Sequence, residues 1–252
     1  MTALSDSSTT LREPALRGQT VVVIGGSSGI GLATARSARA EGAHVVLTGR
    51  DPERLRRAAG DVGALRHAAF DAHEPEGLDA FFGSLDAPVD HVMVAAGGPY
   101  YAPLPDLDVA DAARYVADHV RLALGAARQA AGTVRPGGTL LLVSGTGARR
   151  PAVGIAVTAL LTAGLPALTA NLALELAPVR VNLIAPGFVD TPLSASLLGS
   201  ELDARRAQLR ATLPIHRVVQ PEDVAALAVH LMVNTALTGA TFDVDGGQQV
   251  LG

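Results

Sequence analysis

The chain has 252 residues, a formal net charge of −4 and 48% apolar residues. That length and composition provide a large core for one domain or at most two, and the mild acidity gives no sign of a nucleic-acid-binding surface. The absence of cysteine excludes disulfides, zinc thiolates and a cysteine nucleophile, and the scattered histidines and carboxylates show no metal-ligand spacing.

The first seventeen residues, 1–17, are polar, rich in serine and threonine, and contain Pro14. They lack the apolar run of a signal peptide, so we expect a flexible tail on a cytoplasmic protein. Residues 18–252 are expected to form one domain, because no linker, repeat or low-complexity segment interrupts them.

Strand-like and helix-like segments alternate through this domain. The strand-like runs lack polar alternation, which is typical of a parallel sheet buried on both faces. We therefore predict an α/β fold with a single Rossmann-type, doubly wound parallel sheet of about seven strands flanked by helices. In chain order the expected elements are strand 20–25, a helix to about 41, strand 44–48, helix 52–59, strand 64–70, helix 75–84, strand 89–95, helix 109–131, strand 138–144, helix 153–177, strand 179–184, helices 193–213 and 222–233, and strand 241–244.

Residues 152–174 hold no charged side chain, so their length alone would allow a membrane span. Gly154, Pro166 and Asn171 dilute the apolar run, and it falls inside the alternating strand–helix pattern. We therefore expect a core or subunit-interface helix with a kink at Pro166, and no membrane partner.

A glycine-rich segment follows the first strand and opens the first helix. Glycines in this context allow a tight turn, close approach of a pyrophosphate, and phosphate binding at the helix N-terminus. The segment therefore predicts dinucleotide binding. Its candidate cofactor residues are Gly25, Ser27, Ser28, Gly29, Ile30 and Gly31.

The second strand ends at Gly49-Arg50, with no carboxylate to hold a ribose 2′-hydroxyl. Arg50 suits a 2′-phosphate, which favours NADP(H) over NAD(H), although Arg50 could also be the solvated start of a loop. Asp71 follows the third strand, where it could accept from the adenine amine or cap the next turn.

Several separated motifs arrive in the order typical of the short-chain dehydrogenase/reductase family, which the chain resembles over residues 19–252. The glycine-rich turn is the first motif, the segments 172–177 and 179–182 resemble the approach to the family's sixth strand, and 217, 221–225 and 245–247 complete the series. The resemblance implies a nicotinamide-dependent oxidoreductase that acts on a small-molecule substrate. It also implies a homodimer or homotetramer paired through helices 109–131 and 153–177.

The resemblance adds cofactor residues in two further loops. Residues 96–97 match the end of the family's Asn-Asn-Ala-Gly motif, and the loop 186–191 matches the segment that holds the nicotinamide side of the cofactor. The candidates that the resemblance implies are Ala96, Gly97, Pro186, Gly187, Val189 and Thr191.

The chain departs from the family at the residues that perform the chemistry. The family's tyrosine and lysine positions are Thr158 and Thr162, and its serine position is Gly145, next to Ser144. No register shift restores these groups, because all twenty basic residues are arginine and the last tyrosine is Tyr115. A threonine hydroxyl is too weak an acid to replace an activated tyrosine.

Other side chains could replace the missing acid. His119 occupies the position of the family's helix-borne asparagine and titrates near neutral pH, but a packed helix histidine is the alternative. Ser144 or Thr146 could hold a substrate oxygen. Either Tyr100 or Tyr101 could enter the pocket, although both could instead pack as an ordinary lid.

Two functions remain open from the sequence. One is an NADP(H)-dependent oxidoreductase that acts on a carbonyl, an alcohol or a related small apolar substrate by a non-standard proton path through Tyr100, His119, Ser144, Thr158 or Thr162. The other is a catalytically inactive NADP(H)-binding sensor or partner subunit. Both predict cofactor binding, and only the first predicts turnover.

Overall fold

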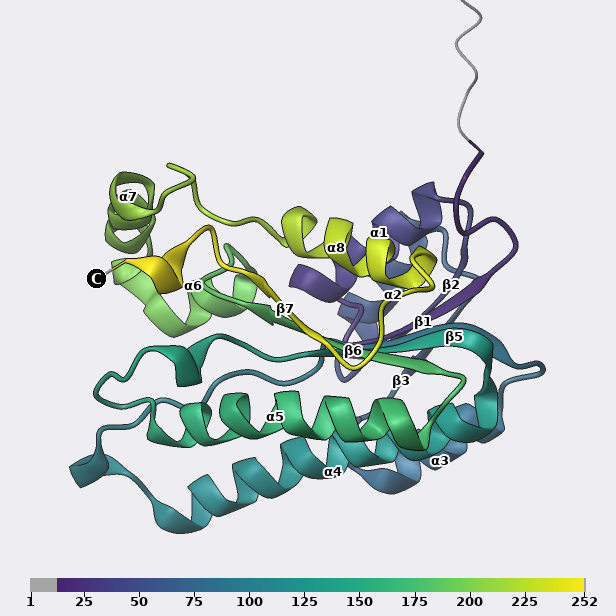
Figure 1. The fold of residues 1–252 in the computed structure, drawn as a ribbon, viewed down its shortest axis with the longest axis horizontal. Coiled ribbons are helices and arrows are strands. Elements are labelled where there is room, and N and C mark those ends of the chain that lie inside the picture. The colour runs from purple at the N-terminus through teal and green to yellow at the C-terminus, as the bar shows by residue number, and fades with distance from the viewer. Residues whose placement is uncertain (1–12, 252) are drawn as a thin grey trace, which may run out of the picture.

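The computed structural model describes residues 13–251. Seven parallel strands form one sheet in the order β3-β2-β1-β4-β5-β6-β7, with helices on both faces (Figure 1). The strands are β1 (Thr20–Ile24), β2 (His44–Gly49), β3 (Arg66–Ala69), β4 (Val89–Val94), β5 (Val134–Val143), β6 (Arg180–Pro186) and β7 (Thr241–Val244). The predicted doubly wound Rossmann-type sheet is confirmed.

The helices divide into two layers. One layer packs α1, α2 and α8 on a face of the sheet, and the other packs α3, α4 and α5 on the opposite face (Figure 1). The α-helices are α1 (Gly29–Ala40), α2 (Pro52–Val62), α3 (Pro75–Gly83), α4 (Val109–Thr133), α5 (Ala156–Glu175), α6 (Pro192–Leu198), α7 (Leu202–Thr212) and α8 (Pro221–Val233).

The structure differs from the sequence-based boundaries at several elements. For example, α2 extends to Val62 and α5 begins at Ala156. The helix expected over 193–213 is divided into α6 and α7, because Gly199 adopts φ +51° and ends α6. β5 begins at Val134 rather than 138, with a shift in register opposite Val89 and His91 that accommodates its proline and glycines. Pro166 lies inside α5, as the expected helix over 153–177 has it, and the kink expected at Pro166 stays a prediction.

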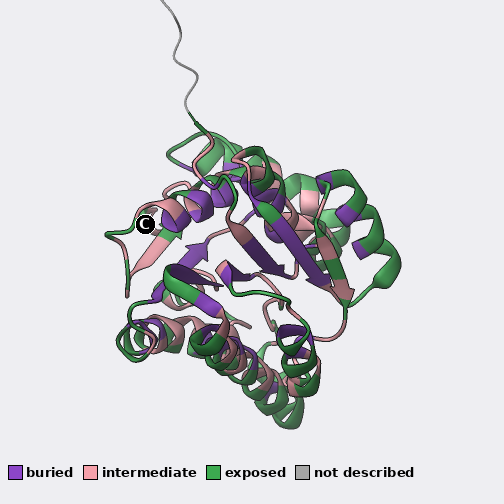
Figure 2. Ribbon diagram, turned by 90° about the vertical axis from the view of Figure 1, so that its right-hand side faces the viewer, coloured by how far each residue is buried: buried purple, intermediate pink, exposed green. Residues whose placement is uncertain are grey.

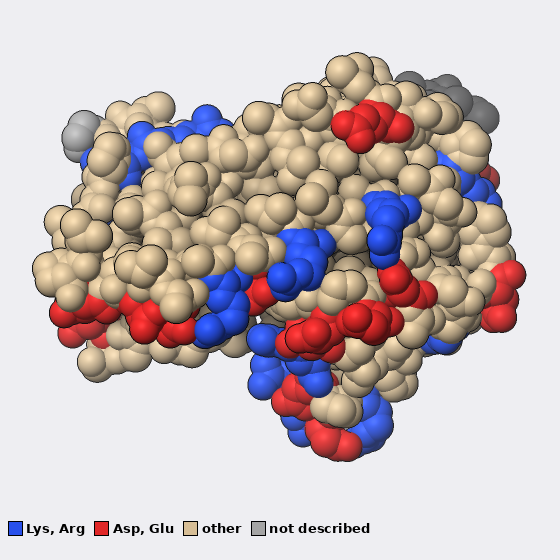
Figure 3. Space-filling model, turned by 90° about the horizontal axis from the view of Figure 1, so that it is seen from below, with Lys and Arg blue, Asp and Glu red and all other residues tan. Residues whose placement is uncertain are grey.

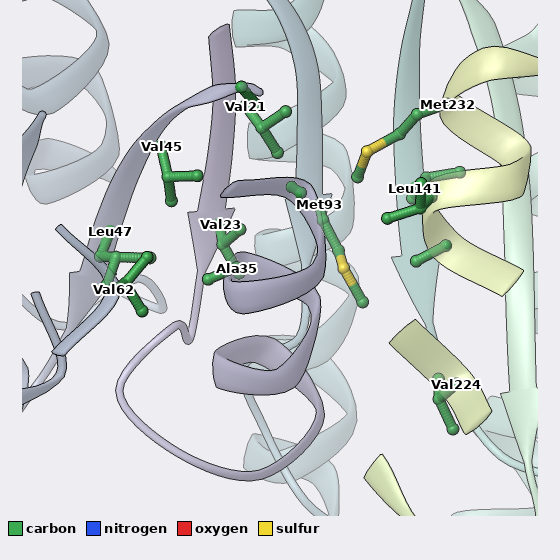
Figure 4. Packing of buried hydrophobic residues seen from close by; sticks show 14 of the residues in the cluster. Val21, Val23, Ala35, Val45, Leu47, Val62, Met93, Leu141, Val224 and Met232 are labelled. Atoms are coloured by element: carbon green, nitrogen blue, oxygen red, sulfur yellow. The ribbon is translucent and has the colours of Figure 1, made fainter. Parts of the chain in front are cut away.

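Alternate residues of each central strand enter different cores. Val21 and Val23 of β1 pack against α1, α2 and α8, whereas Val22 and Ile24 pack against α3, α4 and α5. Figure 2 shows the buried strands between the two helical layers, and Figure 4 shows the first of these cores at close range. Burial on both faces explains why these strands show no polar alternation in the sequence.

The folded body begins before residue 18. Leu16 is fully buried, and its backbone N–H donates to the carbonyl of Glu41 at the end of α1. The tail expected over 1–17 therefore includes residues that pack against the domain, and its residues 1–12 lie outside the described part of the chain.

The outward face of α5 is unusually apolar for an exposed surface. Leu160 is 63% exposed and Leu174 is 80% exposed, and Leu124 of the neighbouring helix α4 is 46% exposed. Figure 3, seen from below, shows a broad uncharged area beside a band of charged side chains.

By length and composition α5 could cross a membrane. Its inward residues, which include Leu161 and Leu172, pack on the sheet layer instead.

Candidate functional site

The glycine-rich turn after β1 has no room for side chains. A Cβ on Gly31 would lie 2.2 Å from the carbonyl oxygen of Gly25, and one on Gly25 would lie 2.8 Å from the backbone of Ala95. Ser28 precedes α1 as its N-cap, but its side chain forms no capping hydrogen bond. The turn therefore leaves backbone N–H groups and a hydroxyl at the start of α1, which is the arrangement that a pyrophosphate requires.

The end of β2 lies beside this turn and has no side chain at Gly49. Gly49 leaves space for Ser27, whose hydroxyl oxygen would lie 3.1 Å from a Cβ at position 49. Arg50 follows as an exposed side chain that forms no hydrogen bond or ion pair with any residue of 13–251. Arg54 instead pairs with Asp51, the N-cap of α2. Arg50 and Ser27 thus provide donors at the place where a ribose 2′-substituent would lie.

Asp71 forms a local turn rather than a free acceptor site. Its Oδ1 accepts from the backbone N–H of His73 at 3.0 Å and contacts Nδ1 of the same residue at 2.9 Å. Partial burial opposes ionisation, but these two hydrogen bonds lower the pKa of Asp71. The turn-capping interpretation of Asp71 therefore describes the structure, and its contact with adenine stays a prediction.

His119 lies against the loop that follows β4. A Cβ on Gly97 would lie 2.8 Å from His119 Nε2, so the missing side chain at 97 makes room for the imidazole. Nδ1 donates to the carbonyl of Tyr115 at 2.9 Å. Burial lowers the pKa of His119, although the carbonyls of Tyr115 and Gly98 oppose this. The neutral ring predominates at pH 7, with its proton on Nδ1.

The hydroxyls of the two threonines at the family's tyrosine and lysine positions both form hydrogen bonds with backbone carbonyls. Thr158 Oγ1 donates to the carbonyl of Tyr100 at 2.7 Å, and Thr162 Oγ1 lies 3.0 Å from the carbonyl of Thr158 and 3.2 Å from that of Ala159. A hydroxyl has one proton to donate. Neither threonine therefore has a proton directed toward a ligand.

Tyr115 is the site residue that the sequence analysis missed. Its phenol donates to the carbonyl of Gly98 at 2.6 Å, and its ring lies 5.4 Å from the Tyr100 ring and 4.2 Å from the His119 ring, between centroids. Burial raises the pKa of Tyr115 to about 12, and the nearby Thr158 hydroxyl opposes the rise. The spacing of Tyr115 and His119 was the available signal, because residues i and i+4 share one face of a helix.

The remaining candidates surround the same loop. Ser144 and Thr146 follow β5, and their hydroxyls form no hydrogen bond within the described chain. Tyr100 is half-buried beside Tyr115, whereas Tyr101 is 58% exposed. The structure therefore brings Ser144, His119, Thr158, Thr162 and Tyr100 to the carboxyl edge of the sheet, and it adds Tyr115.

The loop after β6 is held by the C-terminal segment. A Cβ on Gly187 would lie 2.7 Å from Asp245 Cβ, and the Phe188 N–H donates to Gln248 Oε1 at 3.1 Å. Thr191 caps α6 by accepting from the Ser194 N–H at 3.2 Å. This loop lies at the same edge of the sheet as the glycine-rich turn, since Thr191 would contact a Cβ at Gly29.

The protein-family model described as Enoyl-(Acyl carrier protein) reductase matches residues 24–249. Short-chain dehydrogenase/reductase ATR9 of Stachybotrys chlorohalonatus is 31% identical, with 93% of this chain and 98% of the relative covered. Dehydrogenase/reductase SDR family member 4 of Sus scrofa is 32% identical, with 94% of this chain and 89% of the relative covered. The chain belongs to the short-chain dehydrogenase/reductase family.

Solved structures of the family agree with this assignment. A small-chain dehydrogenase in complex with NADPH is 27% identical, with a TM-score of 0.79 and coverage of 92% of this chain and 99% of that one. Members of the family are oxidoreductases that bind nicotinamide cofactors. The side-chain-free cradle at Gly25 and Gly31 and the donors at Ser27, Ser28 and Arg50 fit such a cofactor.

Proposed function

We propose that this protein is an NADP(H)-dependent oxidoreductase that reduces a carbonyl group on a small, largely apolar molecule, with Tyr115 as its proton donor. The observation that carries the proposal is the position of the Tyr115 phenol, beside the Thr158 hydroxyl and on the Gly98 carbonyl. Thr158 stands where relatives of this family have a tyrosine, so a phenol from α4 replaces one from α5.

Three residues support NADP(H) over NAD(H). Gly49 supplies no carboxylate for a 2′-hydroxyl, and Ser27 and Arg50 supply donors for a 2′-phosphate. The solved relative in complex with NADPH is consistent with this choice. The glycine-rich turn would hold the pyrophosphate, and the loop 186–191 would hold the nicotinamide side.

A bound nicotinamide cofactor supplies the hydride and its orientation. The protein must then protonate the substrate oxygen as negative charge develops there. A threonine hydroxyl is too weak an acid for this step, so in this proposal Tyr115 provides the proton by turning from the Gly98 carbonyl to the substrate oxygen. Water restores the phenol afterwards.

The raised pKa of Tyr115, about 12, makes the phenol a weaker acid but still permits this role in one direction. An alkoxide is a much stronger base than a phenolate, so proton transfer from the phenol to the new alkoxide is favourable. Taking a proton from an alcohol requires the phenolate, which is roughly one part in 10⁵ at pH 7. The site therefore favours reduction over oxidation.

His119 and Ser144 have supporting roles in this proposal. His119 Nδ1–H donates to the Tyr115 carbonyl one turn back on α4, and this bond fixes the imidazole beside Gly97. The imidazole contacts the Tyr115 ring, so in this proposal His119 is a positioning residue for the Tyr115 phenol. Ser144, whose hydroxyl has no partner among the described residues, can donate to the substrate oxygen and orient it.

The decisive experiment follows NADPH fluorescence in the presence of a panel of ketones, quinones and enones. We expect turnover by the wild-type protein and a loss on the order of 10² or more in Tyr115→Phe. Tyr101→Phe, which alters an exposed phenol of the same cluster, is the matched control and should retain most activity. Calorimetry with NADP⁺ should show equal affinity for all three proteins. Equal losses in both variants would remove Tyr115 from the proposal.

A second candidate function is a non-catalytic NADP(H)-binding sensor or partner subunit. The observation that favours it is that Thr158 and Thr162, at the family's tyrosine and lysine positions, both donate to backbone. This candidate predicts tight NADP⁺ binding with no NADPH consumption above the substrate-free background for any compound in the panel.

We also propose that two copies pair through α4 and α5. The exposed leucines 124, 160 and 174 form an apolar surface that a second copy of the same helices would cover. Sedimentation at two protein concentrations tests this, and Leu160→Glu should convert a dimer or tetramer to a smaller species.

A further inference from the structure

A cavity lies between α7 and the short helix η4 (Gln248–Val250). Figure 1 shows α7 close to the C-terminal end of the chain. Its volume is about 480 Å³, which is within the range of small-molecule sites. Its lining consists of Arg150, Arg205, Gln208, Leu209, Thr212, Gln248 and Leu251.

The polar side chains of this cavity are mainly donors. Arg205 is half-buried, uses Nη1 to donate to Gln208 Oε1 at 2.7 Å, and forms no ion pair within residues 13–251. The next residue, Arg206, is neutralised by Asp190 and Asp203. No aspartate or glutamate is among the described residues that line the cavity. A concave surface with several donors, and with no carboxylate among its described lining residues, is suited to an anion.

Two lining residues of the cavity contact the proposed cofactor loop. Gln248 accepts the Phe188 N–H through Oε1, while its amide nitrogen has no partner in the described chain and is available to a ligand. The guanidinium carbon of Arg205 lies 5.9 Å from the centroid of the Phe188 ring. Burial raises the pKa of Tyr101 and the positive charge of Arg205 opposes the rise, so the loop after β4 also approaches Arg205.

We infer that this cavity binds the carboxylate or phosphate end of an extended substrate. The inference rests on the proposed function, because it places the reducible carbonyl near Tyr115 and the anionic end at Arg205. Leu251, which is partly exposed, provides an apolar part of the lining that the body of such a molecule would contact. The substrate is therefore an acid or a phosphate ester with an apolar body.

Calorimetry on the cofactor-free protein tests this inference with hexanoate, hexyl phosphate and hexanol as probes. We expect at least one anionic probe to bind on the order of tenfold or more tightly than hexanol, and to weaken as salt is raised. The difference between hexanoate and hexyl phosphate identifies the head group. Equal binding of all three probes would overturn the inference.

Two variants of α7 distinguish anion binding in the cavity from attraction to the general surface charge. Arg205→Gln should lose most of the preference for the anionic probe, whereas Arg210→Gln, an exposed arginine of α7 outside the cavity lining, should retain it. A similar loss in both variants would contradict the inference. NADP⁺ affinity, measured on the same samples, should be unchanged in Arg205→Gln. If the wild-type protein fails to bind NADP⁺ while the anion preference persists, the proposed function fails and the anion site stands.

Discussion

Thr158 on α5 and Tyr100 in the loop after β4 are joined by two hydrogen bonds through one hydroxyl. Thr158 Oγ1 donates to the Tyr100 carbonyl at 2.7 Å and accepts from the Tyr100 N–H at 2.9 Å. The position at which this family has its tyrosine thus holds a loop in place, 58 residues away in the sequence. That loop includes Gly98, the acceptor for the Tyr115 phenol.

Thr158→Val should loosen this loop. The substitution keeps the shape of the side chain but leaves the Tyr100 N–H and carbonyl without partners, at a cost of about 1–3 kcal/mol in the free energy of unfolding. We also expect faster amide exchange at residues 98–101. Thr162→Val is the matched control, because its hydroxyl binds carbonyls of its own helix and should contribute little. Urea unfolding and hydrogen exchange measure both effects.

The pH dependence of catalysis should differ between the two directions. The pKa of Tyr115, about 12, keeps the phenol protonated across the neutral range, so we expect reduction to be nearly independent of Tyr115 ionisation from pH 6 to 9. Alcohol oxidation requires the phenolate and should rise about tenfold per pH unit over the same range. Initial rates in each direction measure this. A flat oxidation profile would indicate a different base.

Gly31→Ala should weaken cofactor binding by closing the turn after β1. The added Cβ would lie 2.2 Å from the Gly25 carbonyl oxygen, and a backbone atom cannot move aside without deforming the phosphate site. We expect NADP⁺ affinity to fall at least tenfold by calorimetry. Gly60→Ala in α2 is the control, because nothing lies within 4 Å of its Cβ, and it should stabilise the protein by about 0.5–1 kcal/mol. Retained affinity in Gly31→Ala would place the cofactor elsewhere.

The sequence predicted the sheet well because its central strands are buried on both faces, so their composition alone distinguishes them from amphipathic elements. The runs at β1 and β2, for example, are continuous in valine and other apolar residues. The division of the last long helical segment at Gly199 could not be predicted in the same way, because a positive φ depends on how α6 and α7 pack.

The candidate site was harder to predict where it depends on contacts between distant segments. The glycine-rich turn is local, so its spacing was sufficient. Tyr115 was not among the predicted candidates, although His119 of the same helix was, because the contact between its phenol and Gly98 joins segments that are separate in the sequence. The hydrogen bonds of Thr158 are also invisible in the sequence, since their partner Tyr100 lies in another loop.

His91 should make stability fall in mild acid. Burial lowers its pKa from 6.5 to about 4, with only 3% of the residue exposed and Nε2 lying 2.6 Å from Gln19 Oε1. Because the folded pKa lies below the unfolded value, stability is fully present above about pH 6.5 and declines toward pH 4. The full effect is roughly 3 kcal/mol. His91→Gln should reduce the slope of unfolding free energy against pH in this window, whereas His44→Gln, at an exposed position, should not.

Arg180 is a buried cation that joins β6 to the end of α8. Its guanidinium donates to the carbonyls of Leu231 and Met232, each at 2.7 Å, and to Thr139 Oγ1 at 2.6 Å, with 6% of the residue exposed. These carbonyls include those left unsatisfied at a helix C-terminus, where a positive charge is favourable. The planar guanidinium directs its donors to several acceptors at once.

Arg180→Lys should therefore destabilise the protein although it preserves the charge. An ammonium group has three donors and cannot reproduce the planar arrangement of the five guanidinium donors. Some buried carbonyls therefore lose their hydrogen-bond partners, and the buried positive charge is poorly solvated. We expect a loss of about 2–4 kcal/mol in the free energy of unfolding, measured in urea. Arg135→Lys, in a partly exposed pair with Asp90, should change it by about 0.5 kcal/mol or less. Equal effects of the two substitutions would mean that charge, rather than the geometry of the guanidinium, is what α8 requires.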